Sequence, residues 1–194
     1  ADASIKAVAQ AHKSGRNINA ADIRAATLDS LRAVMLIRAY RSNGHLLAAL
    51  DPLALEEPDL HPELDPASYG FGDDDWERPI FIDNVLGLET ATLTEIIARL
   101  RQTYCGTIGV EFMHVQDPKQ KAWIQERIES INNQTDFTLR GKSAIYERLV
   151  DADEFGKYLH KKFPGTKRFG LDGSEAVIPA LEQILKRGSQ LGLR

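Results

Sequence analysis

The sequence has 194 residues, of which 28 are acidic and 24 are basic, so its formal net charge is -4. This mild acidity argues against a protein that binds nucleic acid or an anionic membrane, because such proteins normally carry a basic face. No run of ~18 apolar residues and no charged-then-apolar leader is present, so we expect neither a membrane span nor a secretory signal. The one cysteine, Cys105, excludes an internal disulfide and a multi-cysteine metal site.

The first part of the chain is predicted to be an arm followed by a helix. Residues 1–20 have few large apolar side chains and are expected to form a flexible arm. Helical spacing then predicts a helix from Asp22 to Asn43. Gly44 would end it, because glycine accepts the left-handed conformation. The predicted apolar stripe of this helix comprises Leu28, Leu31, Val34, Met35, Ile37 and Tyr40.

Residues 51–79 are acidic and rich in proline. They hold five of the eight prolines, and the stretch from Asp51 to Glu77 has ten carboxylates without a Lys or Arg. Prolines at this density prevent a continuous helix, so we predict a long loop with short turns. The loop is either mobile or held by its apolar residues Leu53, Leu55, Leu60, Tyr69, Phe71 and Trp76.

Two further helices have clear start signals. Thr92 and Glu95 form a capping box that predicts a helix as far as Tyr104. Asp117 followed by Pro118 predicts the start of a second helix. Asp is a favourable N-cap residue, and Pro fits the first helical position because the amide hydrogen that it lacks is not used there. The expected apolar side chains are Leu93, Ile96, Ile97, Leu100 and Tyr104 in the first, and Trp123, Ile124 and Ile128 in the second.

The C-terminal third predicts three more helices and little sheet. The first two span Thr138 to Val150 and Asp151 to Phe163. The third is capped by Ser174 and closed by Gly188, and Pro179 makes it start late or kink. The only predicted strands are Ile80–Ile82 and Gly109–Val115, so the fold class is mainly α.

Several polar groups are candidates for chemistry, each with a simpler structural interpretation. His45, after the helix stop, is either an acid, base or ligand, or a turn residue whose ring bonds the backbone. Cys105 is either a nucleophile, with His114 as the nearest histidine in sequence, or a buried structural thiol. An acidic cation site would use His61, Glu63 and Asp65, or Asp73, Asp74 and Asp75; the spacing fits no EF-hand, and a solvated loop is the better interpretation.

A basic group surrounds the Pro164-Gly165 turn. It could bind an anionic substrate or phosphate, or form a solvated surface. Its members are Lys161, Lys162, Lys167 and Arg168. The following Gly170–Glu175 segment leads into a helix N-terminus, but Asp172 and Glu175 already place negative charge there, which weakens a phosphate site. Residue chemistry alone therefore names no reaction.

Four groups of segments carry a family resemblance. They are Tyr40–His45 with Leu50–Leu53, Thr103–Gly106 with Ile108–Met113, Trp123–Gln125 with Arg127–Glu129, and Lys167–Gly173 with Ile178-Pro179. In this order and spacing they resemble the bacterial type of the thiamine-diphosphate-dependent first component of the 2-oxoglutarate dehydrogenase complex. The resemblance covers an N-terminal portion of that much longer family chain.

The resemblance implies an enzyme of the tricarboxylic acid cycle. The whole enzyme would decarboxylate 2-oxoglutarate with thiamine diphosphate and Mg²⁺ and pass the succinyl group to a lipoyl-bearing succinyltransferase component. It would be a cytoplasmic bacterial homodimer without nucleic-acid or membrane partners. No catalytic, cofactor-binding or metal residue is carried onto this chain; Arg168 alone is a candidate to guide the dianionic substrate or support the site from a distance.

The resemblance also implies the domain order. Residues 1–20 would be the arm, 21–165 a helical domain with the loop 51–79, and 166–194 the start of the first catalytic α/β domain, which binds thiamine diphosphate and whose remainder lies beyond this sequence. The segment would be scaffold, bind no cofactor alone and be inactive alone. The alternatives are a stand-alone helical interaction module and a 2-oxoadipate-specific relative.

Overall fold

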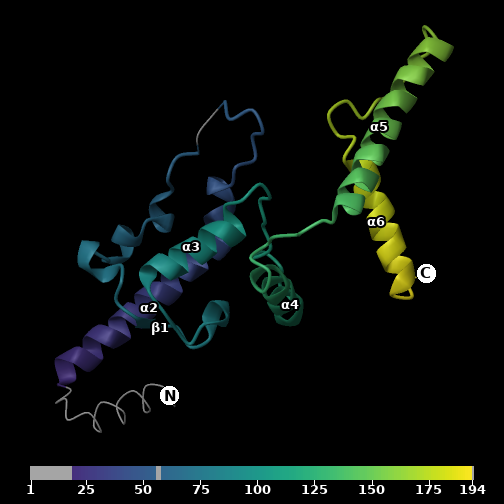
Figure 1. Ribbon diagram of the computed structural model, residues 1–194. Coiled ribbons are helices and arrows are strands. Elements are labelled where there is room, and N and C mark those ends of the chain that lie inside the picture. Colours follow the sequence, from purple (N-terminus) through teal and green to yellow (C-terminus); the bar gives the residue numbers. More distant parts are fainter. Residues whose placement is uncertain (1–18, 56–57, 194) are drawn as a thin grey trace. The chain divides into compact units, whose positions relative to one another are not determined.

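The computed structural model describes residues 19–55 and 58–193 (Figure 1). These residues form five α-helices, several short 3₁₀ turns and one two-stranded sheet, so the predicted mainly α class is confirmed. The helices are α2 (Ala20–Asn43), α3 (Leu93–Tyr104), α4 (Pro118–Glu129), α5 (Leu139–Lys162) and α6 (Val177–Gln190). None of the described helices is long and apolar enough to cross a membrane.

The chain divides into two compact units between Gln134 and Thr135. The first unit contains α2, α3, α4 and the sheet, and the second contains α5 and α6. The predicted boundary between residues 165 and 166 concerns the start of a further domain, and it stays a prediction. The arm predicted for residues 1–20 falls outside the described residues except for Asn19 and Ala20, which begin α2.

The core of the first unit lies between α2 and α3. The capping box that starts α3 is present: the Thr92 amide donates to Glu95 Oε2 over 2.8 Å, and the Glu95 amide donates to Thr92 Oγ1 over 3.2 Å. All five predicted apolar residues of α3 are buried. Asp117 caps α4 as predicted, since its carboxylate accepts from the Lys119 amide at 2.8 Å. Along α4, however, Trp123 is 65% exposed, while Ile124 and Ile128 pack against the core.

Helix α2 packs on a different face from the predicted stripe. Leu28, Leu31, Val34 and Met35 are exposed, by between 42% and 59%. The buried positions of this helix are Asp29, Ala33, Leu36, Ile37, Ala39 and Tyr40, of which only Ile37 and Tyr40 were predicted. The error has a physical reason, because α2 is apolar on two opposite sides and the packed side includes small and charged residues.

Gly44 follows α2, but for a different reason from the one predicted. Its φ of -59° and ψ of -29° are right-handed, and the chain continues into a 3₁₀ turn, η1 (Gly44–Leu47). A Cβ at this position would lie 2.6 Å from the Cβ of Tyr104, which is completely buried. Glycine is therefore required here by the close approach of α3.

The acidic loop is a series of short turns. They are η2 (Pro62–Leu64), η3 (Pro66–Tyr69) and η4 (Asp73–Asp75). Phe71 is 5% exposed as the prediction requires, whereas Leu53, Leu55 and Leu60 are largely exposed. The main anchor is Leu64, which is fully buried and was not predicted; its carbonyl accepts a bond from the Tyr40 hydroxyl at 3.2 Å.

One of the two predicted strands is wrong. β1 (Ile80–Phe81) pairs antiparallel with β2 (Thr90–Ala91), with Ile80 opposite Ala91, and a 3₁₀ turn, η5 (Val85–Gly87), lies between them. The segment Gly109–Val115 is irregular, and no described strand pairs with it. Gly109 instead lets the backbone pass close to Leu50 and His45.

The second unit corrects three predictions. The two helices expected over Thr138–Val150 and Asp151–Phe163 are one continuous helix, α5. Lys157 ties the middle together by contacting Asp153 at 2.6 Å and Glu154 at 2.9 Å, which are favourable spacings on a helix. Helix α6 starts late, one of the two outcomes expected from Pro179. Its N-cap is Ala176 and not Ser174, and Gly188 lies inside it and not at its end.

Candidate functional site

A buried polar cluster in the first unit surrounds Glu129, and we call it the Glu129 junction. Arg41 Nε and Nη2 donate to the two carboxylate oxygens of Glu129 over 2.7 Å and 3.0 Å. The Tyr104 hydroxyl donates to Glu129 Oε1 over 2.7 Å. Glu129 is only 8% exposed. The junction therefore joins α2, α3 and α4 through one carboxylate whose charge is compensated by Arg41.

Cys105 is a structural thiol. Its Sγ donates to the carbonyl oxygen of Gly44 over 3.3 Å, which ties the end of α3 to the start of η1. Burial raises the pKa of Cys105 to about 11, and the nearby charge of Arg101 only partly opposes this shift. His114 is exposed and forms no hydrogen bond with the thiol. Among the described residues, the hydrogen bond of the thiol goes to a backbone carbonyl and not to a base, so its contacts favour the structural interpretation over the nucleophile.

The tyrosines of this region are equally unreactive. Burial raises the pKa of Tyr104, and the hydrogen bond to Glu129 raises it further. Burial also raises the pKa of Tyr40, whose hydroxyl bonds the Leu64 carbonyl. Both hydroxyls stay protonated at neutral pH and act as donors that hold the core together.

His45 contacts a carboxylate and not the backbone. Its Nε2 lies 3.9 Å from Glu111 Oε2, and Glu111 is largely exposed. Its Nδ1 is buried and has no hydrogen-bond partner among the described residues. The predicted ring-to-backbone bond is therefore not formed. Among the described residues, no hydrogen bond joins His45 to the Cys105 thiol, and no group of potential metal ligands gathers around it.

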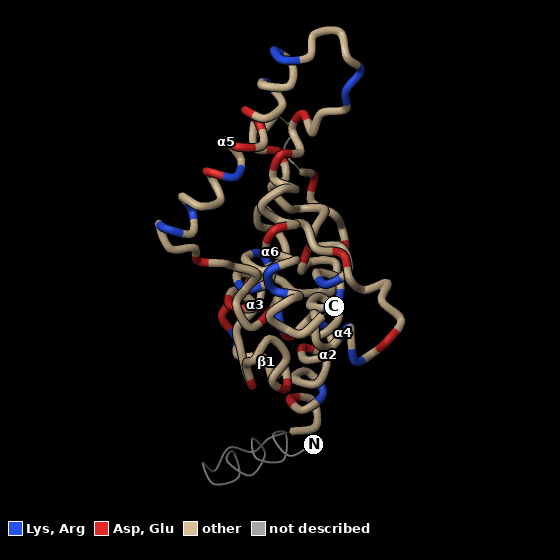
Figure 2. Tube along the Cα trace, turned by 90° about the vertical axis from the view of Figure 1, so that its right-hand side faces the viewer, with Lys and Arg blue, Asp and Glu red and all other residues tan. Residues whose placement is uncertain are grey.

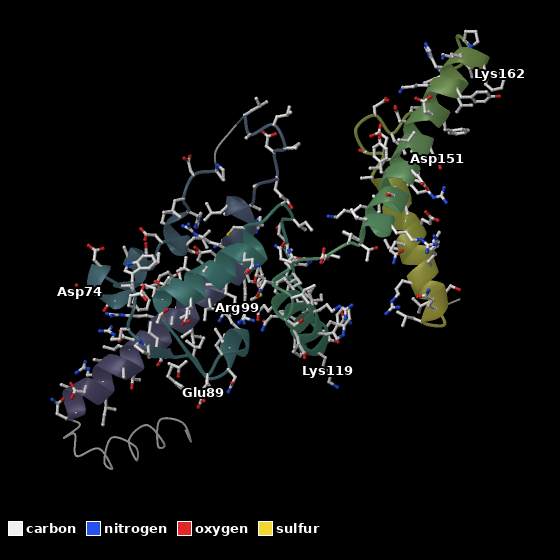
Figure 3. All side chains as sticks on the ribbon, in the orientation of Figure 1. Asp74, Glu89, Arg99, Lys119, Asp151 and Lys162 are labelled. Atoms are coloured by element: carbon white, nitrogen blue, oxygen red, sulfur yellow. The ribbon has the colours of Figure 1, made fainter. Side chains whose placement is uncertain are left out.

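The acidic loop uses its polar groups for turns. His61 Nδ1 accepts from the Glu63 amide, and Asp65 accepts from the Ala67 amide at 3.0 Å. Asp75 accepts from the Gly72 amide at 2.8 Å and pairs with Arg78 at the same distance. Figure 3 labels the neighbouring Asp74. Within the described parts of the chain, no three potential ligands gather to hold a metal ion.

The basic group lies at the turn after α5, where Figure 2 shows basic positions on both sides of the turn and Figure 3 labels Lys162 near the helix end. Arg168 Nη2 lies 2.7 Å from His160 Nδ1, and Lys167 Nζ lies 5.6 Å from the centre of the Phe169 ring. Among the described residues, no carboxylate pairs with Arg168. Before α6, the Gly173 amide donates a hydrogen bond to the Glu175 carboxylate over 3.0 Å. This amide is therefore not free to bind a phosphate.

A groove of about 620 Å³ runs between α5 and α6. Its charged lining is already paired: Arg148 lies 3.0 Å from both Asp151 and Glu182, and Lys186 lies 2.6 Å from Glu182. The pocket holds no histidine, cysteine, serine or threonine. It offers no hydroxyl or thiol nucleophile, and the lining carboxylate outside these ion pairs, Glu147, would repel an anionic substrate.

Three of the four groups of segments that carry the family resemblance meet in the first unit, and the fourth lies in the second unit. Arg41 and Gly44 come from one segment, Tyr104 and Cys105 from the second, and Glu129 from the third. Sequence reasoning missed the role of Arg41 and Glu129, which are 88 positions apart and give no local signal. By its fold, the chain is a mainly α region, and three of these groups of segments build the core of its first unit.

Comparison with known proteins identifies the relatives of this region. The chain is 56% identical over 181 residues to the 2-oxoglutarate dehydrogenase E1 components of Brucella canis, Brucella suis and Brucella abortus. The match covers 93% of this chain and 18% of each relative, at its N-terminal end. No family model matches the chain. The predicted resemblance is confirmed: this chain is homologous to the N-terminal part of 2-oxoglutarate dehydrogenase E1 components, and it spans about a fifth of their length.

Proposed function

We propose that this chain works as the N-terminal scaffold of a 2-oxoglutarate dehydrogenase first component. The observation that supports the proposal is the 56% identity over 93% of the chain to proteins of that name. The reaction would be the oxidative decarboxylation of 2-oxoglutarate, followed by succinyl transfer to a lipoyl group on the second component. The enzyme would work as a homodimer in the bacterial cytoplasm. Residues 166–194 would open its first α/β domain.

The cofactors of such an enzyme do not fit the described residues. Thiamine diphosphate, when bound, supplies a carbanion-stabilising ring, and Mg²⁺ holds its diphosphate. The described residues gather no group of metal ligands, and the Gly173 amide is taken by Glu175. We therefore place cofactor binding in the part of the enzyme beyond this segment and derive no chemical step from these residues.

Arg168 is our one candidate for a role near the substrate. It is exposed, and the one hydrogen-bond contact that its guanidinium makes with a described residue is to the His160 ring, so its charge is available to an anion. Such a charge would attract the dianionic 2-oxoglutarate before the chemical step. In the complete enzyme, Arg168→Gln should raise KM, leave kcat nearly unchanged and reduce the dependence of kcat/KM on ionic strength. Arg168→Lys keeps the positive charge, so its KM should lie close to that of the unmodified enzyme. Unchanged kinetics in Arg168→Gln would show that Arg168 has no role near the substrate.

A chimera tests the proposal as a whole. Residues 1–194 would replace the matched segment of the Brucella canis E1 component, and succinyl transfer to a lipoyl-bearing partner would be measured. We expect the chimera to form succinyl-lipoyl groups with 2-oxoglutarate and to prefer it over 2-oxoadipate. A folded chimera with no transfer would contradict the proposal and favour a stand-alone module. A preference for 2-oxoadipate would favour the relative specific for that acid.

A further inference from the structure

Helix α6 contacts α5 through its polar side. Glu182 reaches Arg148 of α5, and the α6 positions that line the groove include Pro179, Gln183 and Lys186. Pro179, Glu182 and Gly188 are the least exposed residues of this helix. On the α6 side the groove is therefore lined by small and polar residues, with the Arg148–Glu182 ion pair across it, whereas α5 contributes the apolar side chains of Ile145 and Leu149.

The apolar side of α6 faces away from α5. Five large side chains share it, and all are exposed, from 39% for Ile178 to 73% for Leu185. They are Val177, Ile178, Leu181, Ile184 and Leu185. At 3.6 residues per turn these five fall within an arc of roughly 120°, opposite Pro179 and Lys186. We call this surface the outer face of α6.

This arrangement is the reverse of an ordinary surface helix. An amphipathic helix normally buries its apolar stripe and leaves its polar side in water. Covering a large aliphatic side chain stabilises by about 1.5–3 kcal/mol relative to full exposure, so an uncovered stripe of five is unfavourable. Contiguous apolar surface of this kind marks a site of contact with another structure.

We propose that the outer face of α6 packs against the part of the E1 polypeptide that follows the matched segment, an inference that rests on the proposed function. The chain covers 18% of each relative at its N-terminal end, so the remaining 82% follows the matched region. In such a polypeptide the following chain emerges next to α6. Its effective concentration at the outer face therefore exceeds that of any separate partner.

Protection of a cysteine placed on this face tests the inference. Ile184→Cys is introduced into the isolated chain and into the Brucella canis chimera, and the rate of maleimide labelling is measured by mass spectrometry of the peptide. If the inference is right, Ile184→Cys is labelled rapidly in the isolated chain and at least about tenfold more slowly in the chimera. In the chimera the following chain covers the cysteine, which reacts only when that contact opens locally. Gln190→Cys, on the polar side of α6, is the matched control and should label at similar rates in both. The native Cys105 should react only slowly with maleimide at neutral pH, because burial raises its pKa to about 11.

Each other outcome overturns the inference. Equal labelling of Ile184→Cys in both proteins would show that the following chain leaves the face open. Protection in the isolated chain that grows with its concentration would assign the face to a second copy. Succinyl transfer by the chimera is scored separately, so an active chimera with an unprotected Ile184→Cys would refute this inference and leave the proposed function standing.

Discussion

Gly44 begins η1 and lies against α3. Its Cα hydrogen fits beside α3 where the methyl group of an alanine would not. Cys105 bonds its carbonyl, and Tyr104 packs beside its Cα. Three residues before Gly44, Arg41 of α2 pairs with Glu129 of α4 and adds the compensated charge of the Glu129 junction. At the scale of single residues, close packing and buried hydrogen bonds thus account for the motif residues of the first unit.

Replacing Gly44 by alanine should destabilise the first unit. The new Cβ would lie 2.6 Å from the Tyr104 Cβ, so the helices must separate, at a cost of about 1–3 kcal/mol. Both tryptophans belong to this unit, so urea unfolding followed by tryptophan fluorescence measures the change. Gly106→Ala is the control, because its Cβ would make only ordinary contacts, at 3.7 Å or more. Equal stability of the two variants would contradict the close packing at Gly44.

Cys105 predicts a defined pH dependence. Its pKa is about 11 in the folded chain against an ordinary value of 9.0. Below pH 9 the thiol is neutral in both the folded and the unfolded chain. Between pH 9 and pH 11 the unfolded chain loses the thiol proton while the folded chain keeps it. The free energy of unfolding therefore falls as the pH rises toward 11.

Alkylation by iodoacetamide measures this directly. The rate in the folded chain should rise with a midpoint near pH 11, and in urea-unfolded chain near pH 9. Cys105→Ser, which has no thiol, gives the background. A folded midpoint at or below pH 9 would show an activated thiol and contradict its structural role.

At the scale of elements, α2 and α6 share a property that a sequence pattern does not resolve. Each carries apolar side chains on a side that the described residues leave uncovered. For α2 the uncovered residues Leu28, Leu31, Val34 and Met35 are larger than several of the buried ones, such as Ala33. Periodicity therefore detects the helix but selects the wrong side when both sides are apolar.

Paired leucine variants test which side of α2 supports the core. Leu36→Ala removes a fully buried side chain and should lower the free energy of unfolding by about 2–5 kcal/mol. Leu31→Ala, at a position 58% exposed, should change it by less than about 0.5 kcal/mol. Urea unfolding of the isolated chain gives both values. The reverse order of the two effects would mean that the predicted stripe, and not the observed face, is the buried one.

At the scale of the whole molecule, the sequence predicted local features better than distant contacts. Capping at Thr92 and Asp117 was predictable because each cap is encoded within three residues. Leu64 as the anchor of the acidic loop was not, because its burial depends on Tyr40, 24 positions away. The sequence predicted two helices in place of α5 because Asp151 resembles an N-cap residue. The helix is continuous there, and the ion pair of Lys157 with Asp153 stabilises it just beyond this position.

The candidate site followed the same division. The structural interpretation of Cys105 could be favoured from the sequence because a nucleophile needs a base and a lowered pKa, and the raised pKa agrees with it. The Glu129 junction could not, since no local pattern connects Arg41 with Glu129. The family motifs located both residues or their neighbours without revealing their role, because a shared motif marks a constraint and does not say whether packing or chemistry imposes it.

Release of carbon dioxide from 2-oxoglutarate labelled at C1 tests most directly whether this region is scaffold and not catalyst. The isolated 194-residue chain is supplied with thiamine diphosphate and Mg²⁺, and the Brucella canis E1 component serves as the positive control. We predict release no faster than in the same solution without protein. Release that increases in proportion to the chain's concentration and depends on thiamine diphosphate would contradict the scaffold role.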